Sequence, residues 1–134
     1  MIGKLLKNQD GQAMVENAIV LPILLTIFFI FVGGGVWFGG YLIVGDVTHE
    51  VARKYAVTGD MTHSIQYGQE LFNKWNIGFA QPNPSITVSR SGHRVNAQTI
   101  AQPKLKVPFI TLPTIERKSS CMMEYVWRDR SAYD

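Results

Sequence analysis

The feature that most constrains this chain is an uncharged run of 29 residues, Asn17 to Gly45, bounded by Glu16 and Asp46. Most of these residues are apolar. A transmembrane helix needs about 20 predominantly apolar residues to cross about 30 Å of hydrocarbon. The run is therefore long enough to cross a bilayer and to continue beyond it, and it predicts one membrane-spanning helix near the N-terminus.

The charges before this run predict its direction. Lys4 and Lys7 precede it, and only Asp10 opposes them. Positive residues flanking a membrane helix stay in the cytoplasm. We therefore expect a single pass through a membrane, with a cytoplasmic N-terminus and a C-terminal part on the opposite side. A cleaved secretory signal is the alternative, but its apolar region would be shorter, and no small-residue cleavage site closes this run cleanly.

The expected membrane helix contains three notable features: a proline, a glycine pair and an aromatic pair. Pro22 lacks a backbone N–H and should kink or loosen the first turns. Gly35 and Gly39 form a GxxxG pair, which permits close approach of another helix. Trp37 and Tyr41 follow at i, i+4 spacing, where an aromatic belt would lie at the far interface.

An acid stands at the start of the apolar run. A carboxylate in or beside hydrocarbon costs a few kcal/mol unless it is paired, so Glu16 is a candidate functional residue. Gly11 precedes it by five residues, behind a short basic leader. An acid that only caps the helix N-terminus is the simpler interpretation.

The segment Gly11–Pro22, GQAMVENAIVLP, resembles the processing site of type IV pilin-like proteins, and more specifically that of the TadE-like minor pseudopilins of tight-adherence (Flp, type IVb) pili. Asn17 stands where that family usually has Phe, and residues 51–59 resemble the helical segment that follows its membrane helix. The matching positions are Val15, Glu16, Ala18 and Pro22.

The resemblance implies cleavage by a membrane prepilin peptidase between Gly11 and Gln12. Glu16 would become the fifth residue of the mature chain, and the new amine of Gln12 would be mostly protonated at neutral pH. In such filaments the acid of one subunit meets the amine of its neighbour. Pairing within one chain at i, i+4 is also possible, and cyclisation of Gln12 would remove the amine's charge.

The part that follows the membrane run reads first as helical. Residues 46–59 continue the helix, with Val47, Val51, Tyr55 and Thr58 on one face. Gly59 and Asp60 should end it. A second helix is expected over Thr62–Trp75, capped by Asp60 or Thr62. Its apolar residues are Ile65, Leu71, Phe72 and Trp75, and Gly68 weakens the prediction.

The remaining residues predict a small antiparallel sheet. Residues 86–90 alternate apolar and polar side chains, Ser91-Gly92 reads as a hairpin turn, and a second strand follows around residues 94–100. Residues 104–109 and 122–127 are further candidate strands. The fold class is therefore α+β: a leader (1–11), a long helix (12–60) and a small periplasmic α+β domain (61–134), with the sheet packed on the helix.

Catalytic and metal-binding patterns do not emerge. His49, His63 and His93 show no ligand spacing with one another or with Cys121, the single cysteine. We expect no metal, no cofactor and no enzymatic activity. The net charge of +3 is well mixed, so no nucleic-acid interface is predicted. A modest basic cluster reads as a solvated face: Arg117, Lys118, Arg128 and Arg130.

The resemblance implies a structural subunit used in assembly of a tight-adherence or related type IV pilus. Its partners would be prepilin peptidase, other pilin subunits, the inner-membrane assembly platform and membrane lipid. Two alternatives stay open. One is a pseudopilin of a secretion or DNA-uptake machine, and the other is an uncleaved single-pass anchor whose outer domain binds a ligand.

Overall fold

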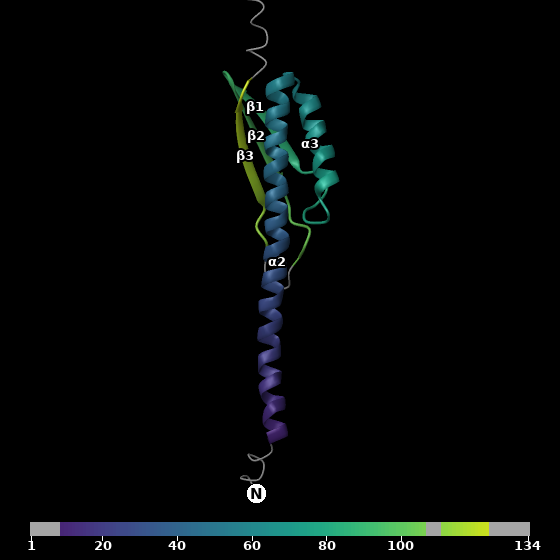
Figure 1. The fold of residues 1–134 in the computed structure, drawn as a ribbon, viewed down its shortest axis with the longest axis vertical. Coiled ribbons are helices and arrows are strands. Elements are labelled where there is room, and N and C mark those ends of the chain that lie inside the picture. The colour runs from purple at the N-terminus through teal and green to yellow at the C-terminus, as the bar shows by residue number, and fades with distance from the viewer. Residues whose placement is uncertain (1–8, 107–110, 124–134) are drawn as a thin grey trace, which may run out of the picture.

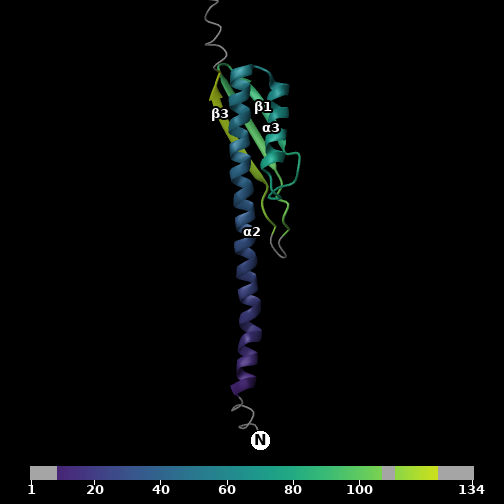
Figure 2. The same ribbon diagram turned by 45° about the vertical axis from the view of Figure 1, so that its right-hand side comes forward.

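The computed structural model describes residues 9–106 and 111–123. It contains two helices and one sheet, α2 (Gln9–Thr58), α3 (Met61–Trp75), β1 (Ser85–Ser91), β2 (Arg94–Ala101) and β3 (Ile115–Met122). Figure 1 shows α2 as one long rod, with α3 and the sheet gathered around its C-terminal half. The turned view in Figure 2 gives the same arrangement. The predicted α+β class is confirmed.

The long helix ends where the sequence predicts. Gly59 has a φ of 69°, a left-handed conformation that suits glycine, and its N–H donates to the carbonyl of Tyr55 at 2.8 Å. Asp60 then caps α3, because its carboxylate accepts from the backbone N–H of His63 at 3.1 Å. Of the two caps expected from the sequence, Asp60 is the one used, and Thr62 lies within the first turn.

The sheet is antiparallel in the order β1-β2-β3. The β1–β2 hairpin turns at Gly92, which has a φ of 60°. Its register pairs Val88 with Ala97, and the β2–β3 register pairs Ala97 with Ser119. The predicted first hairpin is therefore confirmed, with strands one residue longer at some ends.

The last strand does not lie where the sequence pattern predicts it, so that prediction is wrong. It covers residues 115–122 and not 122–127, of which 124–127 lie outside the described residues. Its inward positions after Ile115 are Arg117, Ser119 and Cys121, so the strand shows no apolar alternation. Residues 104–106 of the other candidate strand are not in a strand, and 107–109 lie outside the described part.

The core lies between α2 and the sheet. Among the described residues, fourteen hydrophobic residues are buried, and α2 supplies six of them. Val47, Val51 and Tyr55 face inward as predicted, whereas Thr58 is exposed. On α3, Phe72 is fully buried, while Trp75 remains 38% exposed. The contributors from α2 are Val44, Val47, Val51, Ala52, Tyr55 and Ala56.

Candidate functional site

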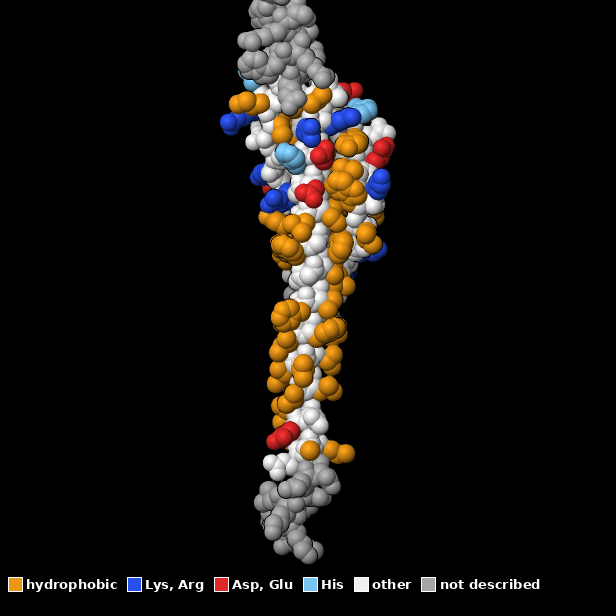
Figure 3. Space-filling view, in the orientation of Figure 1, with side chains coloured by type: hydrophobic (Ala, Val, Ile, Leu, Met, Phe, Trp, Pro, Cys, Tyr) orange, Lys and Arg blue, Asp and Glu red, His pale blue; other side chains and the backbone are white. Residues whose placement is uncertain are grey.

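The N-terminal half of α2 stands clear of the rest of the molecule. Figure 3 shows it covered with hydrophobic side chains, while charged side chains gather around the globular part. Phe28 and Phe31 are 60% and 77% exposed. By length and composition, α2 is the one helix among the described residues that could cross a membrane. Exposed apolar side chains on such a helix indicate a single-pass membrane anchor.

The predicted cleavage and charge-pairing residues lie in the first turns of this exposed half. Gly11 is inside α2, and nothing lies within 4 Å of the position its Cβ would take. Glu16 is exposed, and it forms no ion pair with any residue from 9–106 or 111–123. Its neighbour Val15 is 61% exposed. The carboxylate therefore projects from an apolar surface without a partner in the described part of its own chain.

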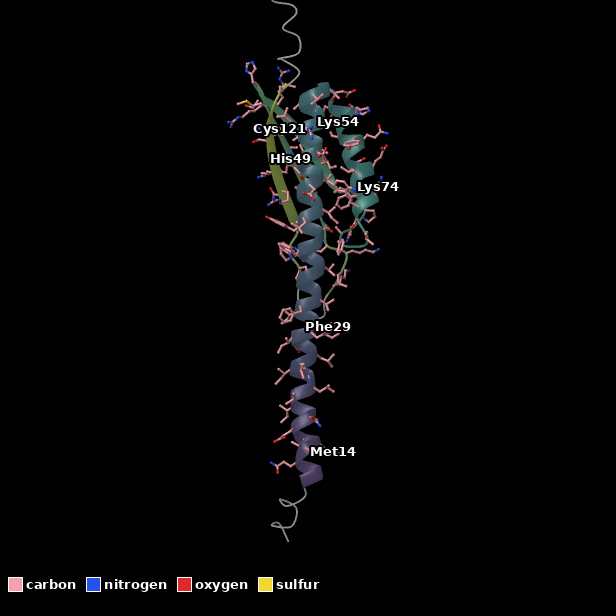
Figure 4. All side chains as sticks on the ribbon, viewed as in Figure 1. Met14, Phe29, His49, Lys54, Lys74 and Cys121 are labelled. Atoms are coloured by element: carbon pink, nitrogen blue, oxygen red, sulfur yellow. The ribbon has the colours of Figure 1, made fainter. Side chains whose placement is uncertain are left out.

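Pro22 lies inside α2, and the helix continues through it as one element. The hydroxyl of Thr26 donates to the carbonyl of Pro22 at 2.8 Å, a local bond that keeps the hydroxyl satisfied in an apolar setting. Met14 and Phe29, labelled on either side of this segment in Figure 4, lie along the same continuous rod. The expected kink or loosening at Pro22 stays a prediction.

The two glycines of the GxxxG pair have different surroundings. Nothing lies within 4 Å of the position that a Cβ on Gly35 would take. A Cβ on Gly39 would meet the ring of Phe79 at 3.0 Å, because the loop after α3 packs there. Gly40 is equally close to the sheet, with Ile115 Cδ1 at 2.9 Å. Gly39 therefore serves packing within the chain, and helix–helix packing through Gly35 stays a prediction.

The aromatic pair on α2 joins the rod to the globular part. Trp37 and Tyr41 stack with ring centroids 5.4 Å apart. The indole Nε1 of Trp37 donates to the carbonyl of Pro113 at 2.9 Å. Arg117 on β3 lies 4.5 Å over the ring of Tyr41 and donates to its hydroxyl. The expected belt residues are therefore also the contact between α2 and the segment leading into β3.

Arg117 corrects an expectation. The sequence pattern predicts Arg117 on a solvated basic face, but this residue is half-buried against α2. Its Nε lies 3.2 Å from the position that a Cβ on Gly45 would take. Its neighbour Lys118 is exposed and pairs with Glu116 at 3.0 Å. Arg128 and Arg130 lie outside the described residues. Gly45 lies four residues after Tyr41 on α2, and both face Arg117 of β3. This match joins distant parts of the chain, so the sequence does not display it.

Among the described residues, the histidines and Cys121 do not gather into a metal-binding group. His49 on α2 lies near β3, where its Nδ1 is 3.3 Å from the hydroxyl of Ser119, and Cys121 lies two residues further along that strand (Figure 4). In the part of the chain that the structure describes, no three His, Cys, Asp or Glu side chains are placed to hold a metal ion. The absence of catalysis, metal and cofactor stays a prediction.

Comparison with known families matches residues 11–53 to the family described as TadE-like protein. No match was found among curated proteins or among solved structures. The matched segment begins at Gly11 and ends in the part of α2 that packs against the globular region. It contains the exposed acid, the apolar rod and the aromatic contact described above. Over residues 11–53, about a third of its length, the chain is therefore similar to TadE-like proteins.

Proposed function

We propose that this protein is a minor pilin or pseudopilin, a non-enzymatic subunit that prepilin peptidase processes before it enters or primes a type IV filament of the tight-adherence kind. The TadE-like assignment indicates a pilus-associated protein of this general class. The observation that carries the finer proposal is Glu16, an exposed acid on an exposed apolar helix, with no ion-pair partner among the described residues. An acid at this position could pair with a cation from another subunit, which would make it functional.

The cut is proposed between Gly11 and Gln12, at the cytoplasmic face. Both residues lie in the first turn of the described part of α2. A peptidase must open this turn to reach the bond. Glycine weakens a helix by roughly 0.5–1 kcal/mol relative to alanine, so Gly11 makes the opening easier. Substitution by a bulky residue both strengthens the turn and obstructs the approach to the scissile bond.

Cleavage supplies a new cation for Glu16. The new amine of Gln12 is mostly protonated at neutral pH when unperturbed. Pairing it with the Glu16 carboxylate of a neighbouring subunit offsets part of the desolvation cost of each charge and fixes the axial register. The globular part, held on the upper half of α2, would then decorate the filament surface or cap its end.

The first experiment establishes the mature N-terminus. Intact-mass measurement and N-terminal sequencing of the membrane-extracted protein are expected to show a chain that begins at Gln12, either free or cyclised. Gly11→Leu is expected to leave full-length protein in the membrane. A native chain that retains Met1 contradicts the proposal and favours the uncleaved anchor.

The second experiment separates cleavage from assembly. Glu16→Ala is expected to be processed normally but to be lost from sheared filaments, because the mature amine of a neighbour has no acid to meet. Asp46→Ala is the matched control, since Asp46 is also an exposed acid on α2. If Glu16→Ala enters filaments as well as Asp46→Ala does, charge pairing does not place the subunit. Co-purification with secretion components in place of pilus components would favour the pseudopilin alternative.

A further inference from the structure

Two loops meet at the end of the globular part nearest the apolar half of α2. We call residues 76–79 and 102–106 the membrane-proximal tip. Gln81 N–H donates to the carbonyl of Gln102 at 2.8 Å, and Lys104 N–H donates to the carbonyl of Phe79 at 3.2 Å. An isolated bridge also pairs Ala80 with Pro103. The two loops therefore form one backbone-bonded unit, which Figures 1 and 2 show beside α2 below α3 and the sheet.

The position of the tip along α2 is fixed by packing. The Phe79 ring lies against Gly39, and its Cβ is 3.6 Å from the position of a Cβ on Gly40. Trp37, one turn earlier, bonds to Pro113. The tip is consequently held at the level of residues 39–40 of the rod.

That level coincides with the far headgroup layer if Glu16 marks the near edge of the hydrocarbon. Trp37 is 21 residues beyond Glu16, which is about 32 Å along a helix and close to the hydrocarbon thickness of about 30 Å. Gly40 lies three residues further, at about 36 Å. The headgroup regions extend a bilayer to about 40–45 Å in total, so the tip falls within the outer one.

The tip carries the side chains that suit such a layer. Ile77 is 85% exposed, and Leu105 is 36% exposed. Lys104 and Lys106 flank Leu105 and are both exposed. No Asp or Glu occurs in the sequence between Glu70 and Glu116, and Glu116 is paired with Lys118. Exposed apolar side chains near lysines that form no ion pair with any described residue are typical of contact with anionic lipid at a membrane interface.

We propose that the membrane-proximal tip docks on the outer leaflet of the bilayer that α2 spans. Ile77 and Leu105 enter the interface, and Lys104 and Lys106 bind the phosphates of anionic lipids. The tip is continuous with the apolar surface of α2, which favours lipid over a separate soluble partner. This inference rests on the membrane insertion in the proposed function. It adds that the globular part is seated on the membrane before assembly and must leave the lipid to enter a filament.

Depth measurement by spin labelling tests the docking. The full chain carries Cys121→Ser, so that the label attaches only at a chosen position, and is placed in nanodiscs of equal phosphatidylcholine and phosphatidylglycerol. Ile77→Cys is the test position and Ile27→Cys the mid-helix reference. Ser91→Cys, at the exposed hairpin end of β1, is the distant control. Accessibility to a water-soluble nickel chelate is compared with accessibility to oxygen.

The label at Ile77 is expected to be protected from the chelate several-fold relative to the label at Ser91, and less than the label at Ile27. Equal chelate access at Ile77 and Ser91, with Ile27 embedded, overturns the docking and leaves the membrane span intact. Chelate access at Ile27 overturns both. Spin–spin broadening at Ile77 that disappears on dilution with unlabelled chain assigns the surface to a second copy and likewise overturns the proposal.

Changing the lipid charge tests whether Lys104 and Lys106 bind anionic lipid. Replacing phosphatidylglycerol with phosphatidylcholine is expected to raise chelate access at Ile77, and Lys104→Gln with Lys106→Gln is expected to abolish that response. The matched control is Arg90→Gln with Arg94→Gln, two exposed cations at the hairpin end, which should leave the response unchanged. A response to lipid charge that survives the lysine substitutions, or no response in the parent chain, overturns the assignment of Lys104 and Lys106.

Discussion

Gly68 lies where α3 packs against α2. A Cβ at this position would lie 2.2 Å from Cγ2 of Val51, which is fully buried. The sequence suggests only that glycine weakens the expected helix, since the partner helix cannot be seen in it. In the structure the missing side chain is what allows the two helices to pack.

Gly68→Ala therefore sets two effects against each other. Alanine favours a helix interior by about 1 kcal/mol over glycine, whereas overpacking a core costs typically 1–3 kcal/mol. Because the clash involves the branched side chain of Val51, we expect net destabilisation. Thermal and denaturant unfolding of the full chain in detergent, followed by circular dichroism, measures it. Asn73→Ala, at an exposed position of α3, is the control, and a more stable Gly68→Ala would show that α3 shifts to accept the methyl.

Tyr41 and Arg117 test the contact between α2 and β3. Tyr41→Phe keeps the ring under the guanidinium and removes the hydroxyl that Arg117 donates to. We expect a loss of about 1 kcal/mol in the free energy of unfolding, the usual net value of a hydrogen bond. Lys118→Gln breaks only an exposed ion pair and should cost no more than about 1 kcal/mol. An unchanged stability in Tyr41→Phe would show that stacking alone holds the arginine.

At the scale of elements, the start of α3 depends on one carboxylate. Asp60→Ala removes the acceptor for the N–H of His63 and should destabilise the protein by roughly 1 kcal/mol. Asp60→Asn keeps an acceptor and should retain most of the stability. Thr62→Ala, at the alternative cap considered from sequence, should have little effect, as Thr62 is exposed inside α3. A larger loss at Thr62 than at Asp60 would contradict the cap, with denaturant midpoints as the readout.

The elements that sequence predicts well have local signals. The helix end at Gly59, the cap at Asp60 and the turn at Gly92 each follow from one or two residues with special backbone chemistry. Strand β3 has no such signal, because it presents Arg117 and Ser119 to α2. An arginine fits an inward position only because Tyr41 and Gly45 on another element receive it. That complementarity is a tertiary property, and periodicity cannot report it.

At the scale of the whole molecule, the candidate site also has one part with local sequence signals and one part that depends on tertiary contacts. Glu16 is the last charged residue before the 29-residue uncharged run, and Gly11 precedes it by five residues, so the sequence places both directly. The level at which the globular part meets α2 depends on Phe79 packing at Gly39, which joins residues 40 positions apart. Sequence therefore locates the proposed processing site but does not locate the tip that the fold brings toward the membrane.

The boundary expected at residues 60 and 61 divides the core of the globular part. In the part of the chain that the structure describes, six of the fourteen buried hydrophobic residues lie on α2, and the sheet has three strands. Strands β2 and β3 pack against α2, so removing α2 would expose the apolar inner face of the sheet to water. We therefore predict that a fragment of residues 61–134 stays unfolded, whereas residues 37–134, which keep the Trp37 and Tyr41 contacts, fold.

Dispersion of amide resonances and a cooperative thermal transition distinguish the two fragments. Val47→Asp in the longer fragment is the matched control, because it places a charge at a fully buried position of α2 without shortening the chain. It should unfold the longer fragment as removal of α2 does. A folded 61–134 fragment would mean that α2 is only a stalk, and the globular part could then move relative to the rod. If neither the short fragment nor the Val47→Asp fragment folds, as we expect, then α2 and the globular part are one structural unit. A force applied to α2 would then reach the sheet directly.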